Sequence, residues 1–272
     1  MLRTAAALGF AMVATAELPN NARVITQLRG GFQSNATTGC TPGDNSFDIL
    51  ILVEQWPGTV KVKASEFTLH GLWPSRTGAN APNYPCNCTG EQFDLSKVSS
   101  IQSQLEEWWP SYSGDDPTFW AHEYEKHGTC AEVLTPLSSE LKFMQGALNL
   151  RQQQNTYETL QTAGVVPSMT EEYSVDAVTG AFHLETIIHC DGTNRLLEVA
   201  SCYDKTLQQI HCETTAYGGN TCKDSIIYPP VGSSPSSAPA PVAHQCAVDK
   251  HGPPCTQDSD CNGIANCVRC AR

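Results

Sequence analysis

The chain has 272 residues, 40% of them hydrophobic, which is enough for one substantial domain and a small appendage. A formal net charge of −12 at pH 7 argues against tight, non-specific binding to a polyanion, which needs a basic surface, but it leaves room for a transient grip at a locally positive site. No apolar stretch after the N-terminus is long enough to cross a bilayer, so no membrane association is predicted.

Residues 1–16 have the pattern of a signal peptide. Arg3 supplies the positive start, residues 5–13 form an apolar run too short to span a bilayer, and residues 14–16 (Ala-Thr-Ala) form a small-residue cleavage site. An ordinary N-terminal helix is the alternative. The 13 cysteines indicate an oxidising compartment, and Asn35 and Asn87 each begin a glycosylation acceptor sequence. We expect a protein that is secreted, or delivered through the secretory pathway to a vacuolar or lysosomal lumen.

The predicted strands and helices do not alternate regularly along the chain. Residues 47–54 form a buried strand, and residues 66–70 form a half-buried strand that ends on His70. Helices are predicted at 95–109, 119–131, 138–152 and 156–163, and strands at 181–189, 195–201 and 206–212. The fold class is therefore α+β, with a mainly antiparallel sheet packed with several helices and a small disulfide-rich C-terminal tail.

Several of these segments carry apolar side chains at the spacing of one buried face. The strand at 66–70 directs Phe67 and Leu69 to the core, and Thr68 and His70 to the polar face. The apolar stripe of the first helix consists of Val98, Ile101, Leu105 and Trp108. The stripe of the 138–152 helix consists of Leu141, Met144 and Leu148, and Phe119 and Trp120 are also expected in the core.

The C-terminal region divides into a linker and a tail. Residues 229–243 are rich in proline and serine and predict an extended linker between the main domain (17–228) and a cysteine-rich tail (244–272). The spacing of the tail's cysteines is similar to that of small disulfide-knotted modules that bind carbohydrate or proteins, so we expect a ligand of one of these kinds. Their odd number leaves one thiol over. A zinc site at Cys267 and Cys270 is the alternative, although the oxidising compartment favours disulfides.

Two segments concentrate side chains that can do chemistry, residues 67–75 (FTLHGLWPS) and residues 119–130 (FWAHEYEKHGTC). On a helix, Glu123 and His127 are four residues apart and share one face, and His122 and Lys126 lie on the neighbouring strip. Gly128 is expected to end the regular segment. One helix would then present two imidazoles, a carboxylate and an ammonium group to one small volume.

This set of side chains suits acid–base catalysis on a phosphodiester. Cleaving RNA requires a base for the 2′-hydroxyl proton, an acid for the departing 5′-oxygen, and donors or cations around the phosphorus. Histidine titrates near the working pH, and His70 can face His127 across the phosphate because the two come from different elements. One base, one acid and a clamp of lysine and histidine would therefore suffice to cleave RNA without a metal ion.

Other interpretations of the same residues remain open. A single histidine at the end of a strand is more often structural than catalytic, and the helical pairs could be solvated ion pairs. A zinc site at His122, Glu123 and His127 is disfavoured because helical zinc histidines are four residues apart, whereas these are five apart. A binding or storage role without catalysis is a further interpretation.

The two segments resemble the two signature motifs of the ribonuclease T2 family, His-Gly-Leu-Trp-Pro and His-Glu-x-x-Lys-His-Gly-Thr-Cys. Residues 55–57 (Gln-Trp-Pro) and 226–229 (Ile-Ile-Tyr-Pro) extend the similarity over about residues 38–229. The resemblance implies a ribonuclease T2-like fold, a catalytic domain at 17–228, and no cofactor or metal. It also implies cleavage of single-stranded RNA with low base specificity and no cleavage of DNA, which has no 2′-hydroxyl. We expect the protein to be a monomer.

The resemblance also implies roles for individual residues. His127 would be the general base and His70 the general acid during formation of a 2′,3′-cyclic phosphate, and the roles would exchange when water opens the ring to a 3′-phosphate. Glu123 and Lys126 would stabilise the crowded phosphorane, His122 would bind phosphate, and Trp73 would stack on a base or simply belong to the core. Ser75 stands where relatives often have Asp or Asn, which leaves base preference open.

By the same resemblance we expect three disulfides, Cys88–Cys130, Cys190–Cys222 and Cys202–Cys212. Cys40 and Cys86 are the two cysteines that remain in the main domain, and we pair them on that ground alone. A bond at Cys130 would pin the end of the catalytic helix.

Overall fold

The computed structural model describes residues 39–60, 62–78, 81, 83–233, 244–245 and 254–255. The predicted signal peptide and Asn35 lie outside these residues, as do the side chains of the tail. No helix within the described residues is long and apolar enough to cross a membrane.

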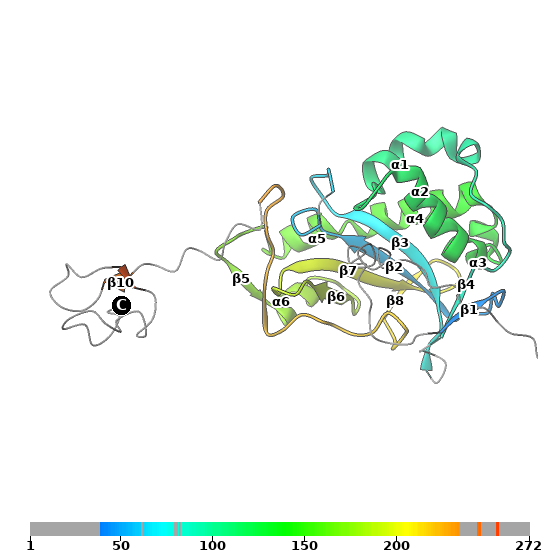
Figure 1. The fold of residues 1–272 in the computed structure, drawn as a ribbon. Helices are drawn as coiled ribbons and strands as arrows, with labels where there is room; N and C mark the ends of the chain where they lie inside the picture. The colour runs from blue at the N-terminus through cyan, green and yellow to red at the C-terminus, as the bar shows by residue number, and fades with distance from the viewer. Residues whose placement is uncertain are drawn as a thin grey trace, which may run out of the picture. The chain divides into compact units, whose positions relative to one another are not determined.

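A five-stranded antiparallel sheet forms the centre of the fold (Figure 1). It consists of β2 (Ile49–Gln55), β3 (Thr68–Ser75), β6 (Ile187–Cys190), β7 (Leu196–Tyr203) and β8 (Gln209–Ile210). The strand order is β3-β2-β7-β6, with β8 paired to β7, so β3 is an edge strand. The expected α+β fold with a mainly antiparallel sheet is confirmed.

Shorter strand pairs flank this sheet. A parallel pair joins β1 (Cys40–Pro42) to β4 (Tyr84–Cys86), and an antiparallel pair joins β5 (Glu172–Ser174) to β9 (Ser225–Ile227). In the tail, β10 (His244–Gln245) pairs antiparallel with β11 (Pro254–Cys255). None of these short strands is predicted, because two or three residues are too few to establish an alternating pattern.

Helices α1 (Gln102–Trp108), α2 (Asp116–Glu123) and α4 (Glu140–Gln154) lie together on one side of the sheet (Figure 1). Leu50 and Leu52 pack in the same hydrophobic cluster as the buried residues of these helices. Ile51 and Val53 pack in a separate cluster with residues of β6 and β7. Apolar side chains therefore cover both faces of β2, which explains its continuous apolar sequence. The remaining helical segments are η2 (Leu95–Ile101), η3 (Tyr124–Gly128), α3 (Thr129–Ala131), η4 (Thr135–Leu137), α5 (Thr156–Thr162) and α6 (Val175–Thr179).

The predicted helix at 95–109 begins as the 3-10 helix η2 and continues as α1. Val98, Ile101 and Leu105 are buried as expected, but the next core position belongs to Trp109, which is fully buried. Because a 3-10 helix has three residues in each turn, the buried positions in α1 are displaced from those that a continuous α-helix would have. Trp108 lies at the edge instead, where the Arg151 guanidinium stacks 3.7 Å from its ring.

Three other details of the predicted pattern are wrong. Leu141 is 37% exposed, and Phe143 takes the buried position on α4. The strand expected at 181–189 is limited to β6, and only Gln209 and Ile210 pair within 206–212. Just before the latter segment, the Asp204 side chain accepts hydrogen bonds from the backbone amides of Thr206 and Gln208, which favours a tight turn over a longer strand.

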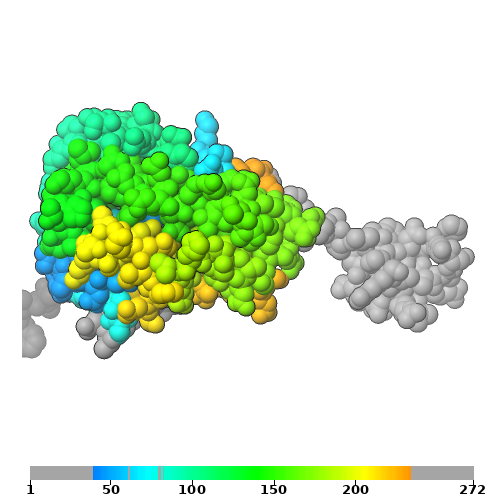
Figure 2. All heavy atoms as spheres, turned by 180° about the vertical axis from the view of Figure 1, so that it is seen from behind, coloured from blue at the N-terminus to red at the C-terminus, as the bar shows by residue number. Residues whose placement is uncertain are grey.

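Figure 2 shows the opposite face of the molecule, where the residues after β7 (yellow) lie beside the first strands of the chain (blue). At this contact the Lys205 ammonium group lies 5.2 Å from the centre of the Phe47 ring. At the other end of the sheet, Trp56 packs against Phe67 and Tyr228, and its Nε1 donates to the Pro229 carbonyl. Pro229 is buried, so the folded unit extends into the first residue of the expected linker.

Candidate active site

His70 occupies a β-bulge in the edge strand β3. Opposite Val53 and Glu54 of β2, the paired residues are Gly71 and Leu69, which leaves His70 as the additional residue. The alternating sequence predicts that the strand ends at His70, but the strand continues to Ser75. Because the bulge shifts the alternation by one residue, Leu69 and Leu72 both pack on the helical side. His70 and Trp73 lie together instead, with ring centroids 4.9 Å apart.

The backbone at the bulge is held from the helical side. Trp109 Nε1 donates to the His70 carbonyl at 2.9 Å, and Trp120 Nε1 donates to the Trp109 carbonyl at 2.7 Å. A bulge interrupts the ladder of backbone hydrogen bonds, so a side-chain donor at this carbonyl replaces a lost strand partner.

The second motif is helical, but it is not one regular α-helix. The segment passes from α2 through a π-helical turn, η3, into α3. Gly128 is expected to end the helix, but it lies inside the helix with helical dihedral angles. A Cβ at Gly128 would lie 2.6 Å from the Tyr124 ring and 2.8 Å from the Phe143 ring, so glycine is needed for close packing. Wide turns of this kind are often found at functional sites.

The Trp73 indole connects the two motifs. Its Nε1 donates to Glu123 Oε2 at 2.8 Å, and its ring centroid lies 5.4 Å from that of His127. Because the same indole also contacts His70, the structure brings both motif histidines to one place. Trp73 is half-buried, which agrees with a position at the edge of the core.

His127 is buried and poorly solvated. Its side chain contacts Trp73 and Tyr84, and its Nδ1 atom is buried without a hydrogen-bond partner. Burial, and the positive charges of Lys126, His122 and His70, lower the pKa of His127 well below its ordinary value of 6.5. The ring can exchange protons with a ligand only through Nε2.

His70 has the opposite environment, although it is the same type of residue. Its Nδ1 lies 2.6 Å from Glu198 Oε1, and 21% of its side chain is exposed. Burial by itself would lower the pKa of His70, but the hydrogen bond and charge of Glu198, with the charge of Glu123, outweigh burial and raise that pKa. At a pH near 6.5 the structure therefore favours a protonated His70 beside a neutral His127.

The other predicted site residues surround these two rings. Glu123 is buried, and burial raises the pKa of its carboxyl group against the opposing effects of His70, the Trp73 bond, His122 and Lys126. The exposed His122 ring lies 4.0 Å from Glu123 Oε1. Lys126 is half-buried, with its ammonium group 5.8 Å from the centre of the Tyr84 ring. The five polar side chains predicted for the site thus lie around one volume.

Three residues of this environment lie outside the two motif segments, and a fourth, Phe119, lies in the second segment but is not predicted to lie at the site. Glu198 binds His70, Tyr84 lies beside His127, and Tyr112 and Phe119 contact the His70 ring at 5.5 and 6.0 Å between centroids. Phe119 is expected in the core, yet it is only partly buried and lies at the site. Its position just ahead of His122 on the same helix is the one signal that could have suggested this.

Disulfides and a polar network brace the segments around the site. The three disulfides implied by the resemblance are formed, and Cys40 also pairs with Cys86. Cys88–Cys130 attaches the loop after β4 to α3, and the Asn87 amide donates to the Lys126 carbonyl at 3.0 Å. The Asn87 side chain is exposed, as a glycosylation acceptor requires.

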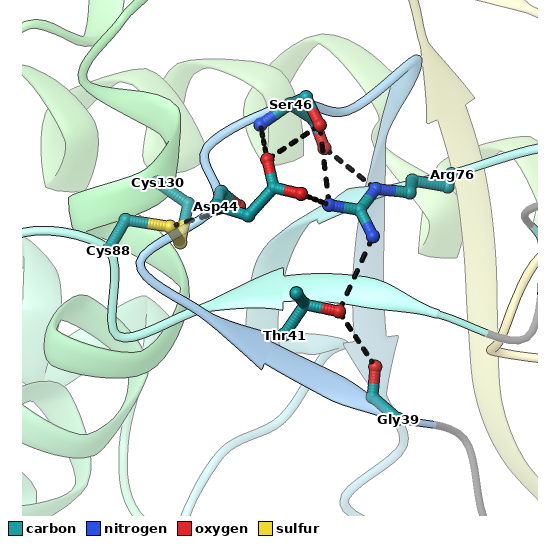
Figure 3. A network of polar contacts seen from close by, with 7 residues as sticks. All are labelled: Gly39, Thr41, Asp44, Ser46, Arg76, Cys88 and Cys130. Atoms are coloured by element: carbon teal, nitrogen blue, oxygen red, sulfur yellow. Dashed lines mark hydrogen bonds and ion pairs between the residues drawn. A yellow bond between two sulfur atoms is a disulfide. The ribbon is translucent and has the colours of Figure 1, made fainter.

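Next to this disulfide, Arg76 holds the chain that follows β3 (Figure 3). Its guanidinium group donates to Asp44 Oδ2 at 2.6 Å and to the Ser46 carbonyl at 2.9 Å. The network joins the end of β3 to the segment that leads into β2, so the edge strand is fixed at the end beyond Trp73.

The motif residues do not form a metal site in this geometry. Among the residues that the structure describes, no group of three or more His, Cys, Asp or Glu side chains is arranged to hold a metal ion. Glu123 instead accepts the Trp73 indole N–H, and the Lys126 cation contributes to the electrostatic environment of His127.

Comparisons with known proteins identify relatives along most of the main domain. A model of the ribonuclease T2 family matches residues 47–212. Extracellular ribonuclease LE of Solanum lycopersicum is 32% identical over 207 residues, which cover 67% of this chain and 87% of that protein. Ribonuclease Oy of Magallana gigas is 34% identical over 179 residues, which cover 60% and 83%. The solved structure of RNase NT in complex with 5′-AMP is similar at a TM-score of 0.60 and 30% identity, over 68% of this chain and 99% of that one.

Proposed function

Since the chain belongs to the ribonuclease T2 family, we propose that it is an endoribonuclease that cleaves single-stranded RNA without a metal ion or cofactor. The observation that carries this proposal is the pair of imidazoles beside Trp73. One is held neutral by burial and the other protonated by a carboxylate, as a general base and a general acid must be at the same pH.

In the first step, neutral His127 takes the 2′-hydroxyl proton through Nε2 while the 2′-oxygen attacks the phosphorus. The bond from phosphorus to the 5′-oxygen breaks, and His70 gives its Nε2 proton to that oxygen. The products are a 2′,3′-cyclic phosphate and a free 5′-hydroxyl. In the second step, His70 takes a proton from water, the water oxygen attacks the cyclic phosphate, and His127 protonates the 2′-oxygen to leave a 3′-phosphate. DNA has no 2′-hydroxyl and is expected to be inert.

The neighbouring residues are proposed to bind and stabilise the phosphate. Lys126 and the exposed His122 supply positive charge or donors to its oxygens, and Glu123 contributes to stabilising the crowded phosphorane. Trp73 is proposed to form part of a base-stacking wall, with its indole oriented by the bond to Glu123. Low base specificity remains our expectation.

We also propose that the protein acts outside the cell or in a vacuolar or lysosomal lumen, as a monomer. Eight of its cysteines are paired in four disulfides, which fits an oxidising compartment, and one of its relatives is named an extracellular ribonuclease. The cysteine-rich tail is proposed to bind carbohydrate or protein and to take no part in catalysis.

The direct test is to incubate the purified protein with polyribonucleotides in excess EDTA and to identify the new ends. We expect cyclic phosphates that convert to 3′-phosphates. His70→Ala and His127→Ala should each lower kcat/KM by about 10² to 10⁴ fold while the protein remains folded. Activity lost in EDTA and restored by zinc would indicate a metal-dependent phosphodiesterase instead. No cleavage by the folded wild-type protein would indicate a binding role.

A further inference from the structure

Glu198 lies outside both motifs, yet its two carboxylate oxygens are engaged next to the site. Oε1 accepts a hydrogen bond from His70 Nδ1 at 2.6 Å. Oε2 accepts one from the Tyr217 hydroxyl at 3.0 Å, and His189 Nδ1 lies 3.7 Å from the same oxygen. Only 13% of the Glu198 side chain is exposed, so this is a buried charge that is paired on both sides.

The sheet itself sets the position of Glu198. In strand β7 it pairs with His189 of β6 on one side and with Gln55 of β2 on the other. The His189 ring stacks on Tyr217 at 4.2 Å between centroids, and His189 Nε2 lies 3.2 Å from the Gly219 carbonyl. Tyr217 also contacts Trp73, at 5.7 Å between centroids. Two packed rings therefore fix the carboxylate from behind while its other oxygen faces His70.

From these contacts we propose that Glu198 is the positioning residue of the general acid, which holds His70 with its Nδ1–H bound and its Nε2–H directed to the substrate. This inference rests on the proposed ribonuclease function and deepens it. Trp109 fixes the backbone of His70 and Glu198 fixes its ring, so together they restrain the rotation of the side chain.

The charged and titratable groups facing His70 come from several elements. Glu198 on β7 has His189 and Tyr217 behind it, and Glu123 and Lys126 come from the second motif. The Tyr112 ring contacts the His70 ring in a T-shaped arrangement. Neighbouring His189 and His70 lower the pKa of Glu198 to about 2 against the effect of burial, while burial and Glu198 raise the pKa of Tyr217 well above its ordinary value. Glu198 is thus ionised and Tyr217 a neutral donor across the working pH range.

The assignment has a specific kinetic consequence. During cleavage the Nε2 proton of His70 moves to the departing 5′-oxygen, and the Nδ1 proton stays on the bond to Glu198. A departing group that is stable as an anion, such as 4-nitrophenolate, needs no proton from an acid. Removing the charge of the Glu198 carboxylate should therefore slow the cleavage of RNA far more than the cleavage of uridine 3′-(4-nitrophenyl) phosphate.

We test this with Glu198→Gln, which can keep an acceptor oxygen but has no charge, and with Glu185→Gln as the control for loss of one exposed carboxylate. We expect Glu198→Gln to lower kcat for RNA by about 10 to 100 fold, which is part of what a general acid contributes. The kcat for the 4-nitrophenyl ester should change by less than about threefold. The pKa of the His70 ring, followed by NMR, should fall in Glu198→Gln and remain unchanged in Glu185→Gln.

The results that would overturn the inference are equally specific. An equal loss on both substrates, or an unchanged pKa of His70, would give Glu198 a structural role only. If the variant does not fold, nitrogen-15 NMR of wild-type histidine decides: neutral His70 must carry its proton on Nδ1, and a proton on Nε2 would refute the assignment. Failure of the proposed function is a separate result, since it appears as absence of RNA cleavage by the wild-type protein.

Discussion

His70 and His127 show how two identical residues can receive opposite properties from their surroundings. His127 is 5% exposed, has an unpartnered Nδ1 and lies near positively charged side chains, whereas His70 is bound to a carboxylate. Burial disfavours the charged ring, and a paired carboxylate favours it. The division of labour between base and acid therefore depends on neighbours that no short motif contains.

These environments predict the pH dependence of kcat/KM. Below the pKa of His127, which is lowered well below 6.5, the base is protonated and activity falls. Above the pKa of His70, which is raised from 6.5, the acid is deprotonated and activity falls again. We expect a bell-shaped profile whose plateau includes pH 6.5 and extends to acid pH, measured with RNA at constant ionic strength. A profile that rises only above neutral pH would contradict this.

Gly71 is the residue of the first motif that a single methyl group should damage. An added Cβ would lie 2.2 Å from both Glu123 Oε2 and Trp73 Nε1, the two atoms of the bond that joins the motifs. We predict that Gly71→Ala destabilises the fold by about 1 to 3 kcal/mol and lowers kcat by more than tenfold, because this bond must break. Gly192→Ala is the matched control, since nothing lies within 4 Å of its added Cβ. Full activity of Gly71→Ala would refute the close contact.

At the scale of elements, both motifs lie on irregular secondary structure. A bulge in β3 places His70 and Trp73 on the same side, and the π-helical turn carries Lys126, His127 and Gly128. Regular strand and helix geometry distributes side chains at fixed intervals. The irregularities change those intervals locally, and they are stabilised by particular partners, which are the Trp109 indole for the bulge and the Asn87 amide for the turn.

The Cys88–Cys130 disulfide should therefore matter for geometry as well as stability. Replacing both cysteines by alanine opens a link across 42 residues and should cost about 4 kcal/mol of unfolding free energy. Because the link ends in α3, directly after η3, we also expect kcat to fall. Replacing Cys202 and Cys212, 10 residues apart, should cost about 3 kcal/mol with kcat unchanged. Chemical denaturation and initial rates measure the two effects, and equal changes in kcat would contradict the prediction.

At the scale of the molecule, the buried carboxyl group of Glu54 connects the central sheet to helices α4 and α5. Glu54 of β2 accepts a hydrogen bond from the Thr156 hydroxyl of α5, and Arg151 of α4 lies 3.8 Å from its other oxygen. Burial raises the pKa of Glu54 to about 7, although both neighbours oppose this. Folding therefore favours the protonated carboxyl group.

This group should make the protein more stable in mildly acidic solution. The unfolded carboxyl group ionises near pH 4.5 and the folded one near pH 7, so its contribution is complete below pH 4.5 and is lost as pH rises to 7. The change is on the order of 3 kcal/mol. Glu54→Gln resembles the protonated side chain, and we expect its unfolding free energy to depend less on pH across this range. As the control, Glu66→Gln should keep the pH dependence of the unfolding free energy that the wild-type protein has. If Glu54→Gln also keeps the wild-type pH dependence, the mechanism is excluded.

The sequence by itself determined the fold class, the main strands and helices, and the two motifs with their catalytic candidates, because these depend on short-range periodicity and on residue type. Only the tertiary structure decided which neighbours set the proton affinity of each histidine, where the strand and helix become irregular, and that Glu198 lies beside His70. Glu198 is 128 residues from His70 along the chain, and a contact of that separation leaves no periodic trace in the sequence. It exists because packing and strand pairing bring the two side chains together.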